Sequence, residues 1–273
     1  MNNYIRAPRY VASMEELFDK GMVTLNHAHT KDNGVMWRLQ RKVVMRVFTT
    51  SNFKLFSEQV FSKYALQIVG KIKEQGGKCD MRTLAGEYTL QSFFDVSCGV
   101  PLVEADDQQG RNFVESLRFV VQHISTRLVA KPYFKYFWWC MPEEYQLKRE
   151  ARVLTNIADK ILDRRLSESE EEIAPRSDIM SLFIKKAREL SVEEGLTSSS
   201  PVLDLGTLRA IFLSLNWAGW DTTSSAITYT FYALALYPEV QEKLFREVSG
   251  GGGDDSSSVA YDSIKKFAYL DAV

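Results

Sequence analysis

The sequence predicts a mainly α-helical fold. Apolar residues recur three and four positions apart along most of the 273 residues, which is the spacing of a helix face. No strand pattern of any length and no internal repeat is visible. The composition, with 45% hydrophobic and 25% charged residues, is that of a globular chain and disfavours a disordered or collagen-like protein.

Three helices are expected in the first hundred residues. The first covers 36–47, with apolar residues on one face and arginine and lysine on the other. The second covers 53–72, where aromatic and branched residues form a single apolar face. The third begins near Asp80, which is a good N-cap, and ends near Gly99, with Pro101 following.

Two further helices are expected on either side of an aromatic connector. They cover about 112–128 and 143–166, and six aromatic residues stand between 133 and 139. Packing of these rings into the core is the favoured interpretation, and contact with a membrane or ligand entrance is the alternative. The second helix is expected to dissolve into the acidic run SESEEE, before a short amphipathic helix capped by Ser177 or Asp178.

The longest expected helix runs from about 204 to 237, after a polar loop at 191–201. At ~1.5 Å per residue it would be a rod of roughly 50 Å. Because it is apolar nearly all the way round, we expect it to lie in a core. Pro238 then suits the first position of a new helix, where its missing N–H costs nothing, and the glycines at 250–253 end that helix.

Charge and metal-ligating residues exclude several classes of function. The 34 basic and 35 acidic residues leave a net charge of −1, which provides no general attraction to nucleic acid or an anionic membrane. Three widely spaced cysteines argue against a disulfide framework and a zinc site. His27 and His29 are one possible metal-ligand pair, but a surface loop is favoured. No stretch reaches the ~18 apolar residues of a membrane span, so the chain as given is expected to be soluble.

A polar block interrupts the long helix and is the first candidate site. Gly costs ~1 kcal/mol relative to Ala inside a helix, so some compensating role is expected for Gly219. Beside Ala218 it would leave a flat notch for a large planar ligand. Thr222 or Thr223 can donate to a carbonyl one turn earlier, and Asp221 beside that hydroxyl would form a proton relay. A polar patch that faces solvent at a helix bend is the alternative.

Trp37 and Arg41 form the second candidate site. They are four residues apart, so they lie on the same face of one helix. An indole N–H and a guanidinium there could both bind a ligand carboxylate. A half-buried tryptophan beside a surface arginine is the simpler interpretation.

Together these motifs resemble the cytochrome P450 family. Residues 218–223, AGWDTT, match its oxygen-side I-helix pattern, and a Leu-x-x-x-Pro-x-x-Gln element follows at 234–241. Trp37-x-x-x-Arg41 matches the C-helix motif that binds a haem propionate. TLQSFFDVSCGV and SDIMSLFIKKA resemble the E and H helices of the branch that oxidises fatty acids and related lipids. The resemblance covers essentially residues 1–273 and implies one incomplete domain, a partial cytochrome P450 fold from the B/C region through the J helix to the start of the K helix.

The resemblance implies a haem monooxygenase. Such an enzyme takes O2, and electrons from NADPH through a reductase, and inserts one oxygen atom into a C–H bond of a lipophilic substrate, here a long-chain fatty acid or related lipid. It implies that Ala218, Gly219 and Thr223 lie on the haem side, that Thr222 holds the bound oxygen, and that Asp221 supplies protons. For a complete member it also implies membrane association at the endoplasmic reticulum, and it implies no nucleic-acid partner.

The sequence also departs from the family pattern. None of Cys79, Cys98 and Cys140 has the setting of the haem-ligating cysteine, and the Glu-x-x-Arg pair of the K helix, the amino-terminal anchor and the first sheet are absent. Trp220 stands where the branch usually has Arg or another polar residue. Ala218 stands where one branch has the Glu that bonds haem covalently, so no covalent attachment is expected. We therefore expect a truncated chain that is inactive alone; a non-catalytic helical remnant or partner-binding fragment is the alternative.

Overall fold

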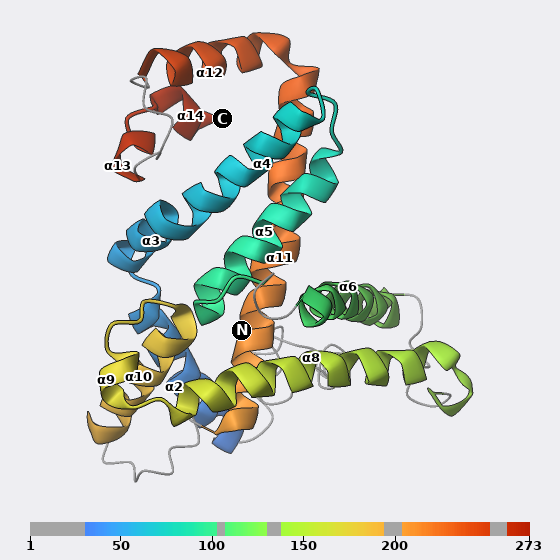
Figure 1. Ribbon diagram of the computed structural model, residues 1–273, viewed down its shortest axis with the longest axis vertical. Coiled ribbons are helices and arrows are strands. Elements are labelled where there is room, and N and C mark those ends of the chain that lie inside the picture. Colours follow the sequence, from blue (N-terminus) through green and yellow to red (C-terminus); the bar gives the residue numbers. More distant parts are fainter. Residues whose placement is uncertain (1–30, 103–106, 130–137, 194–203, 252–260) are drawn as a thin grey trace. The chain divides into compact units, whose positions relative to one another are not determined.

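The computed structural model describes residues 31–102, 107–129, 138–193, 204–251 and 261–273 (Figure 1). These residues form helices joined by turns, with no strand among them, and the predicted mainly α fold is confirmed. His27, His29 and most of the aromatic connector lie outside these ranges. Within the same ranges, no helix combines the length and the apolar character that crossing a bilayer demands.

The chain folds as two compact units. One comprises Met1–Phe48 and Ser97–Trp217, and the other comprises Thr49–Val96 and Ala218–Val273. The long helix α11, Leu205–Leu236, contributes its first part to the first unit and its second part to the second. That all of these residues belong to one domain of a larger fold stays a prediction.

Two pairs of helices organise the first unit. Helix α2, Lys31–Val47, packs on α10, Ile179–Glu193, and α6, Asp107–Val129, packs along α8, Pro142–Ser167 (Figure 1). The first part of α11 packs against α6 through Phe212, whose ring centroid lies 6.4 Å from that of Phe113. Large apolar side chains that are almost completely buried form its core, and they include Phe113, Leu117, Leu154, Leu162, Phe183 and Phe212.

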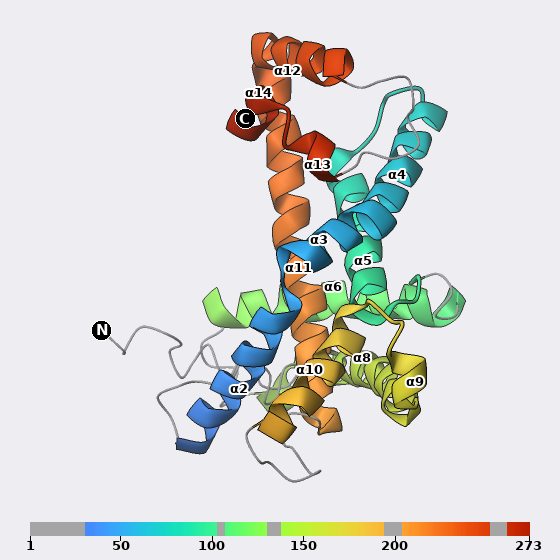
Figure 2. The same cartoon turned by 90° about the vertical axis from the view of Figure 1, so that its left-hand side faces the viewer.

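The second unit contains the remaining helices. They are α3 Thr50–Phe56, the π-helix η1 Ser57–Phe61, α4 Ser62–Glu74, most of α5 Met81–Cys98, the second part of α11, α12 Pro238–Gly251, α13 Tyr261–Ile264 and α14 Ala268–Ala272. Helices α12 and α14 pack together near the carboxyl end of α11 (Figure 2). Their contact includes the Glu247 carboxylate, which accepts hydrogen bonds from the backbone N–H groups of Tyr269 and Leu270.

The predicted helix ends of α5 and α10 are confirmed by their caps. The Asp80 carboxylate accepts from the Arg82 backbone N–H at 3.0 Å, and Gly99 follows α5 at a φ of 68°. Of the two candidate caps of α10, Asp178 is the one used, because its carboxylate accepts from the Ser181 backbone N–H at 2.9 Å.

Two local features differ from expectation. The acidic run after α8 contains a short helix, α9 Glu170–Ile173, which begins with a capping box between Ser169 and Glu172. The helix expected at 53–72 contains the π-turn η1, in which the Ser57 carbonyl accepts from the backbone and hydroxyl of Ser62. A π-turn adds a residue to one turn and rotates the apolar face.

Only the first part of α11 is buried as predicted. Leu208, Ile211 and Phe212 are at most 1% exposed, and Trp220 is the last buried residue of the helix. Beyond it, aromatic and aliphatic side chains are exposed, including Tyr229 at 72% and Tyr232 at 61%. The expectation that the whole helix lies in a core is therefore wrong for its second part.

Candidate functional site

The polar block of α11 presents three of the predicted site residues on its exposed side. Ala218, Asp221 and Thr222 are all exposed, and positions three and four apart share one helix face. The Thr222 hydroxyl donates to the Ala218 carbonyl at 2.6 Å, which confirms the predicted bond to a carbonyl one turn earlier. Exposure of Asp221 also agrees with the alternative of a polar patch that faces solvent.

Several hydroxyl groups in and after this block donate to carbonyl groups of the same helix. In addition to Thr222, the Ser224 hydroxyl donates to the Asp221 carbonyl at 3.1 Å, and Thr228 donates to the Ser224 carbonyl at 2.7 Å. These three hydroxyl groups therefore find acceptors within their own helix. The α-helix continues without interruption to Leu236.

Gly219 faces α5 rather than an open notch. A Cβ atom placed on Gly219 would lie 2.2 Å from Cδ1 and Cε1 of Phe93, closer than any real contact. The space that the sequence suggested for a planar ligand at Gly219 is filled by the Phe93 ring. The accessible surface at this point of α11 is instead that of Ala218, while Thr223 is partly buried.

Trp220 and its neighbours on α5 were not predicted as site residues. Trp220 is 9% exposed, and the nearest heavy atom to a Cβ placed on Gly86 is its Nε1, at 3.7 Å. The buried Thr89 hydroxyl lies 3.3 Å from the Trp220 carbonyl oxygen. A large aromatic residue inside a polar block was the available signal, because such a ring needs an apolar partner on another helix.

The second candidate pair lies on α2, in the first unit. Arg41 Cζ lies 5.2 Å from the centroid of the Trp37 ring, so the two side chains share a face as predicted and form a cation–π contact. Trp37 is half-buried and Arg41 is exposed. The geometry suits a carboxylate ligand, and it equally matches the simpler interpretation of a tryptophan beside a surface arginine.

The cysteines do not form a metal site within the described ranges. Cys98 is buried, with its Sγ 3.7 Å from the Val100 carbonyl oxygen; Cys79 is partly buried and Cys140 is exposed. In the part of the chain that the structure describes, no three His, Cys, Asp or Glu side chains are placed so that they could hold a metal ion.

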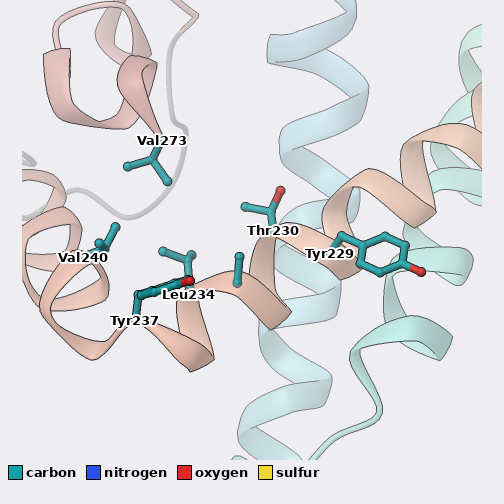
Figure 3. Close-up of a pocket in the computed structure, with 7 residues that line it drawn as sticks. Tyr229, Thr230, Leu234, Tyr237, Val240 and Val273 are labelled. Atoms are coloured by element: carbon teal, nitrogen blue, oxygen red, sulfur yellow. The ribbon is translucent and has the colours of Figure 1, made fainter.

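A hollow of about 310 Å³ begins between one and two turns beyond the polar block (Figure 3). Its lining is mostly apolar and comprises Tyr229, Thr230, Ala233, Leu234, Tyr237, Val240 and Val273. The Thr230 hydroxyl donates to the Ala226 carbonyl at 2.9 Å, so its proton is already used within the helix. The hollow contains none of the predicted site residues.

Comparison with known proteins identifies the family. The family profile described as Cytochrome P450 matches residues 7–273. The chain belongs to the cytochrome P450 family. The roles that the resemblance implied for the Ala218–Thr223 block and for the Trp37–Arg41 pair stay predictions.

The similar proteins are remote in sequence and about twice as long. Cytochrome P450 704B1 of Arabidopsis thaliana is 27% identical over 90% of this chain and 47% of its own length. Cytochrome P450 3A5 of Homo sapiens is 24% identical over 87% of this chain and 47% of its own length. The crystal structure of the cytochrome P450DA heme domain aligns with a TM-score of 0.73 and 15% identity, over 98% of this chain and 53% of that chain. The chain thus has the fold of about half of a cytochrome P450 heme domain.

Proposed function

We propose that this chain is part of a haem-dependent monooxygenase, in which the exposed face of the α11 polar block covers the oxygen side of the haem. The observation that carries the proposal is the Thr222–Ala218 hydrogen bond at 2.6 Å, with Ala218, Thr222 and Asp221 exposed together. When bound, the haem supplies oxygen activation, with electrons from NADPH delivered by a reductase, and one oxygen atom enters a C–H bond of the substrate.

The side chains of the block suit this role. The methyl group of Ala218 allows a flat ring system to approach the helix. Because the Thr222 proton is donated to Ala218, the hydroxyl oxygen remains free to accept a hydrogen bond from water or a bound reactant. Asp221 is exposed, so its carboxylate exchanges protons with solvent and can pass them to a water beside Thr222. Gly219 and Thr223 contribute by shaping the helix on the side of α5.

Trp37 and Arg41 are proposed to hold a haem propionate. The exposed guanidinium offers several N–H donors to a carboxylate, and the Trp37 ring restricts its orientation. None of the three cysteines has the loop setting of the family's thiolate ligand, so no iron ligand is assigned in this chain. Each set of residues, taken by itself, suits one part of a haem: the polar block of α11 suits its oxygen side, and the Trp37–Arg41 pair suits one propionate.

The substrate class is proposed to be a long-chain fatty acid or a related lipid. The support is the resemblance of residues 89–100, which begin on α5 and end just after it, to the E helix of the branch that oxidises such lipids. A reductase partner and a membrane location at the endoplasmic reticulum are proposed for the complete enzyme on the same family basis.

Titration of the purified 273-residue chain with haemin tests the proposal. We expect saturable binding, seen as a shift of the haem absorption band, without a thiolate-type band after reduction and addition of carbon monoxide. Arg41→Leu removes a charge-assisted hydrogen bond worth about 1.5–3 kcal/mol, so binding should weaken at least about tenfold. Arg38→Leu, on another exposed position of α2, is the matched control and should have little effect. Non-saturable binding, or equal effects of the two variants, would contradict the proposal.

A second candidate function is that of a non-catalytic, partner-binding fragment. It is favoured by the exposed apolar residues of the second part of α11, among them Tyr229, Phe231 and Tyr232. A soluble, monodisperse chain that shows no saturable haemin binding would support this candidate instead.

A further inference from the structure

We infer that Trp220 is a positioning residue, which fixes the rotation of α11 so that Ala218, Asp221 and Thr222 face away from α5. Its role toward the reaction rests on the proposed function, whereas the packing itself does not. All of the contacts that carry the inference lie within the second unit.

One face of α5 meets α11 at two consecutive residues. Gly86, Thr89 and Phe93 are spaced three and four apart, so they follow one face of α5. Gly86 and Thr89 meet Trp220, and Phe93 meets Gly219. The missing side chain at Gly219 leaves room for the phenyl ring, whereas a Cβ at Gly86 would make only an ordinary contact with the indole.

Phe93 and Thr89, the α5 side chains in these contacts, also contact other residues of the second unit. The Phe93 ring centroid lies 6.3 Å from that of Phe61, so Phe93 is bounded on one side by Gly219 and on another by Phe61. Thr89 is 1% exposed, and its shortest hydrogen bond goes to Ala85 in its own helix at 2.9 Å. The 3.3 Å contact of this hydroxyl with the Trp220 carbonyl is therefore secondary, and ring packing carries most of the interaction.

Helix geometry converts these contacts into directions for the site residues. At ~100° per residue, the side facing α5 is centred between 219 and 220, and position 223 returns to that side. Positions 218 and 221 then point roughly 150° away, and 222 roughly 110° away. The burial pattern agrees, because Gly219 and Trp220 are buried, Thr223 is partly buried, and 218, 221 and 222 are exposed.

Trp220 is the part of this contact that resists rotation. Gly219 excludes bulk but supplies no side chain to hold the helix. After Trp220, no residue of α11 up to 236 is fully buried. The first part of the same continuous helix is held by its own buried residues, so loss of the indole should loosen only the part beyond 217 from α5. That change would redirect the Thr222 hydroxyl and the Asp221 carboxylate together.

Thiol accessibility at neighbouring positions tests this rotation without haem. The background carries Cys79→Ser and Cys140→Ser. Cys98, which is 0% exposed, reports unfolding of the first unit, and the helix content of each variant, measured by circular dichroism, reports unfolding of the second unit. Single cysteines are introduced as Thr222→Cys or Thr223→Cys in the full 273-residue chain, and their labelling rates with a maleimide are compared. With Trp220 present, we expect the cysteine at 222 to react roughly fivefold faster than that at 223.

Substitutions at Trp220 then decide the inference. Trp220→Ala should bring the ratio of the two rates close to one while Cys98 stays unreactive. Trp220→Phe should restore most of the ratio, and Gly86→Ala, whose new Cβ meets only an ordinary contact at 3.7 Å, is the matched control that should leave it unchanged. A general loss of stability would expose Cys98 as well; in that case Trp220→Leu, which keeps apolar volume, replaces the alanine variant.

An unchanged ratio in the alanine or leucine variant overturns the inference. Failure of the proposed function has a different signature. Haemin bound against the exposed face should protect the cysteine at 222 from labelling when Trp220 is present. Absence of that protection, with the ratio still dependent on Trp220, would reject the haem site and leave the positioning role standing.

Discussion

Arg165 connects three helix ends of the first unit, and its removal should be among the most destabilising single changes there. It is 4% exposed. Its Nη2 donates to the Cys98 carbonyl at 2.6 Å and lies 3.7 Å from the Asp178 carboxylate, and its Nη1 donates to Glu168 at 3.1 Å. Arg165→Met keeps the aliphatic volume but leaves Asp178 and the Cys98 carbonyl without this cation.

The expected cost follows from burial. Removing one partner of a buried ionic network costs about 3–5 kcal/mol, because a desolvated charge is left uncompensated. Arg209→Met is the matched control: Arg209 donates to Asp159 at 2.8 Å, but these side chains are 26% and 29% exposed, so about 0.2–1 kcal/mol is expected. Urea unfolding followed by circular dichroism compares the two free energies of unfolding. Equal costs would refute the argument that burial decides the effect.

Three further predictions concern the second unit and the whole chain. Gly219→Ala should lower the free energy of unfolding by about 1–3 kcal/mol, because the new Cβ overpacks against Phe93; the better helix propensity of Ala offsets ~1 kcal/mol of this loss. Gly70→Ala, which has open space at its Cβ, should be neutral or stabilising in the same urea assay. Equal effects of the two variants would contradict the contact between Gly219 and Phe93. The hydrogen bond from Thr83 lowers the pKa of Asp80. The ionised Asp80 therefore contributes fully to stability above the pKa of an unfolded Asp, and this contribution is lost as pH falls through the lowered pKa. The difference in the free energy of unfolding between the natural chain and Asp80→Asn, measured across that pH range, should become smaller on acidification. The whole chain should melt broadly because of the apolar surface on α11, and a sharp cooperative calorimetric transition would count against this expectation.

Local chemistry made the helix positions predictable. Asp80 and Asp178 are used as caps because their side-chain oxygens satisfy backbone N–H groups within three residues, so no distant partner is needed. The capping box at Ser169 and Glu172 was equally local, and it was overlooked in the acidic run. The π-turn at Ser57 left no comparable signal, since serine is compatible with either helix geometry.

Rotation and burial of α11 were not predictable in the same way. The sequence placed Ala218, Gly219, Asp221, Thr222 and Thr223 on one helix and showed that hydroxyls could bond to its carbonyls. It did not tell which of them face a neighbour, because α11 is apolar nearly all round and has no single preferred face.

By itself, then, the sequence determined the helical class, the order of the motifs and the family, since these depend on residue type and spacing along the chain. Only the tertiary structure decided that Phe93 fills the space beside Gly219, that Trp220 packs against α5, and that burial of α11 ends there. Those features depend on which side chains of α5 meet α11 in space. Close packing of the rings against the glycines fixes this arrangement, and the order of residues along the chain does not reveal it.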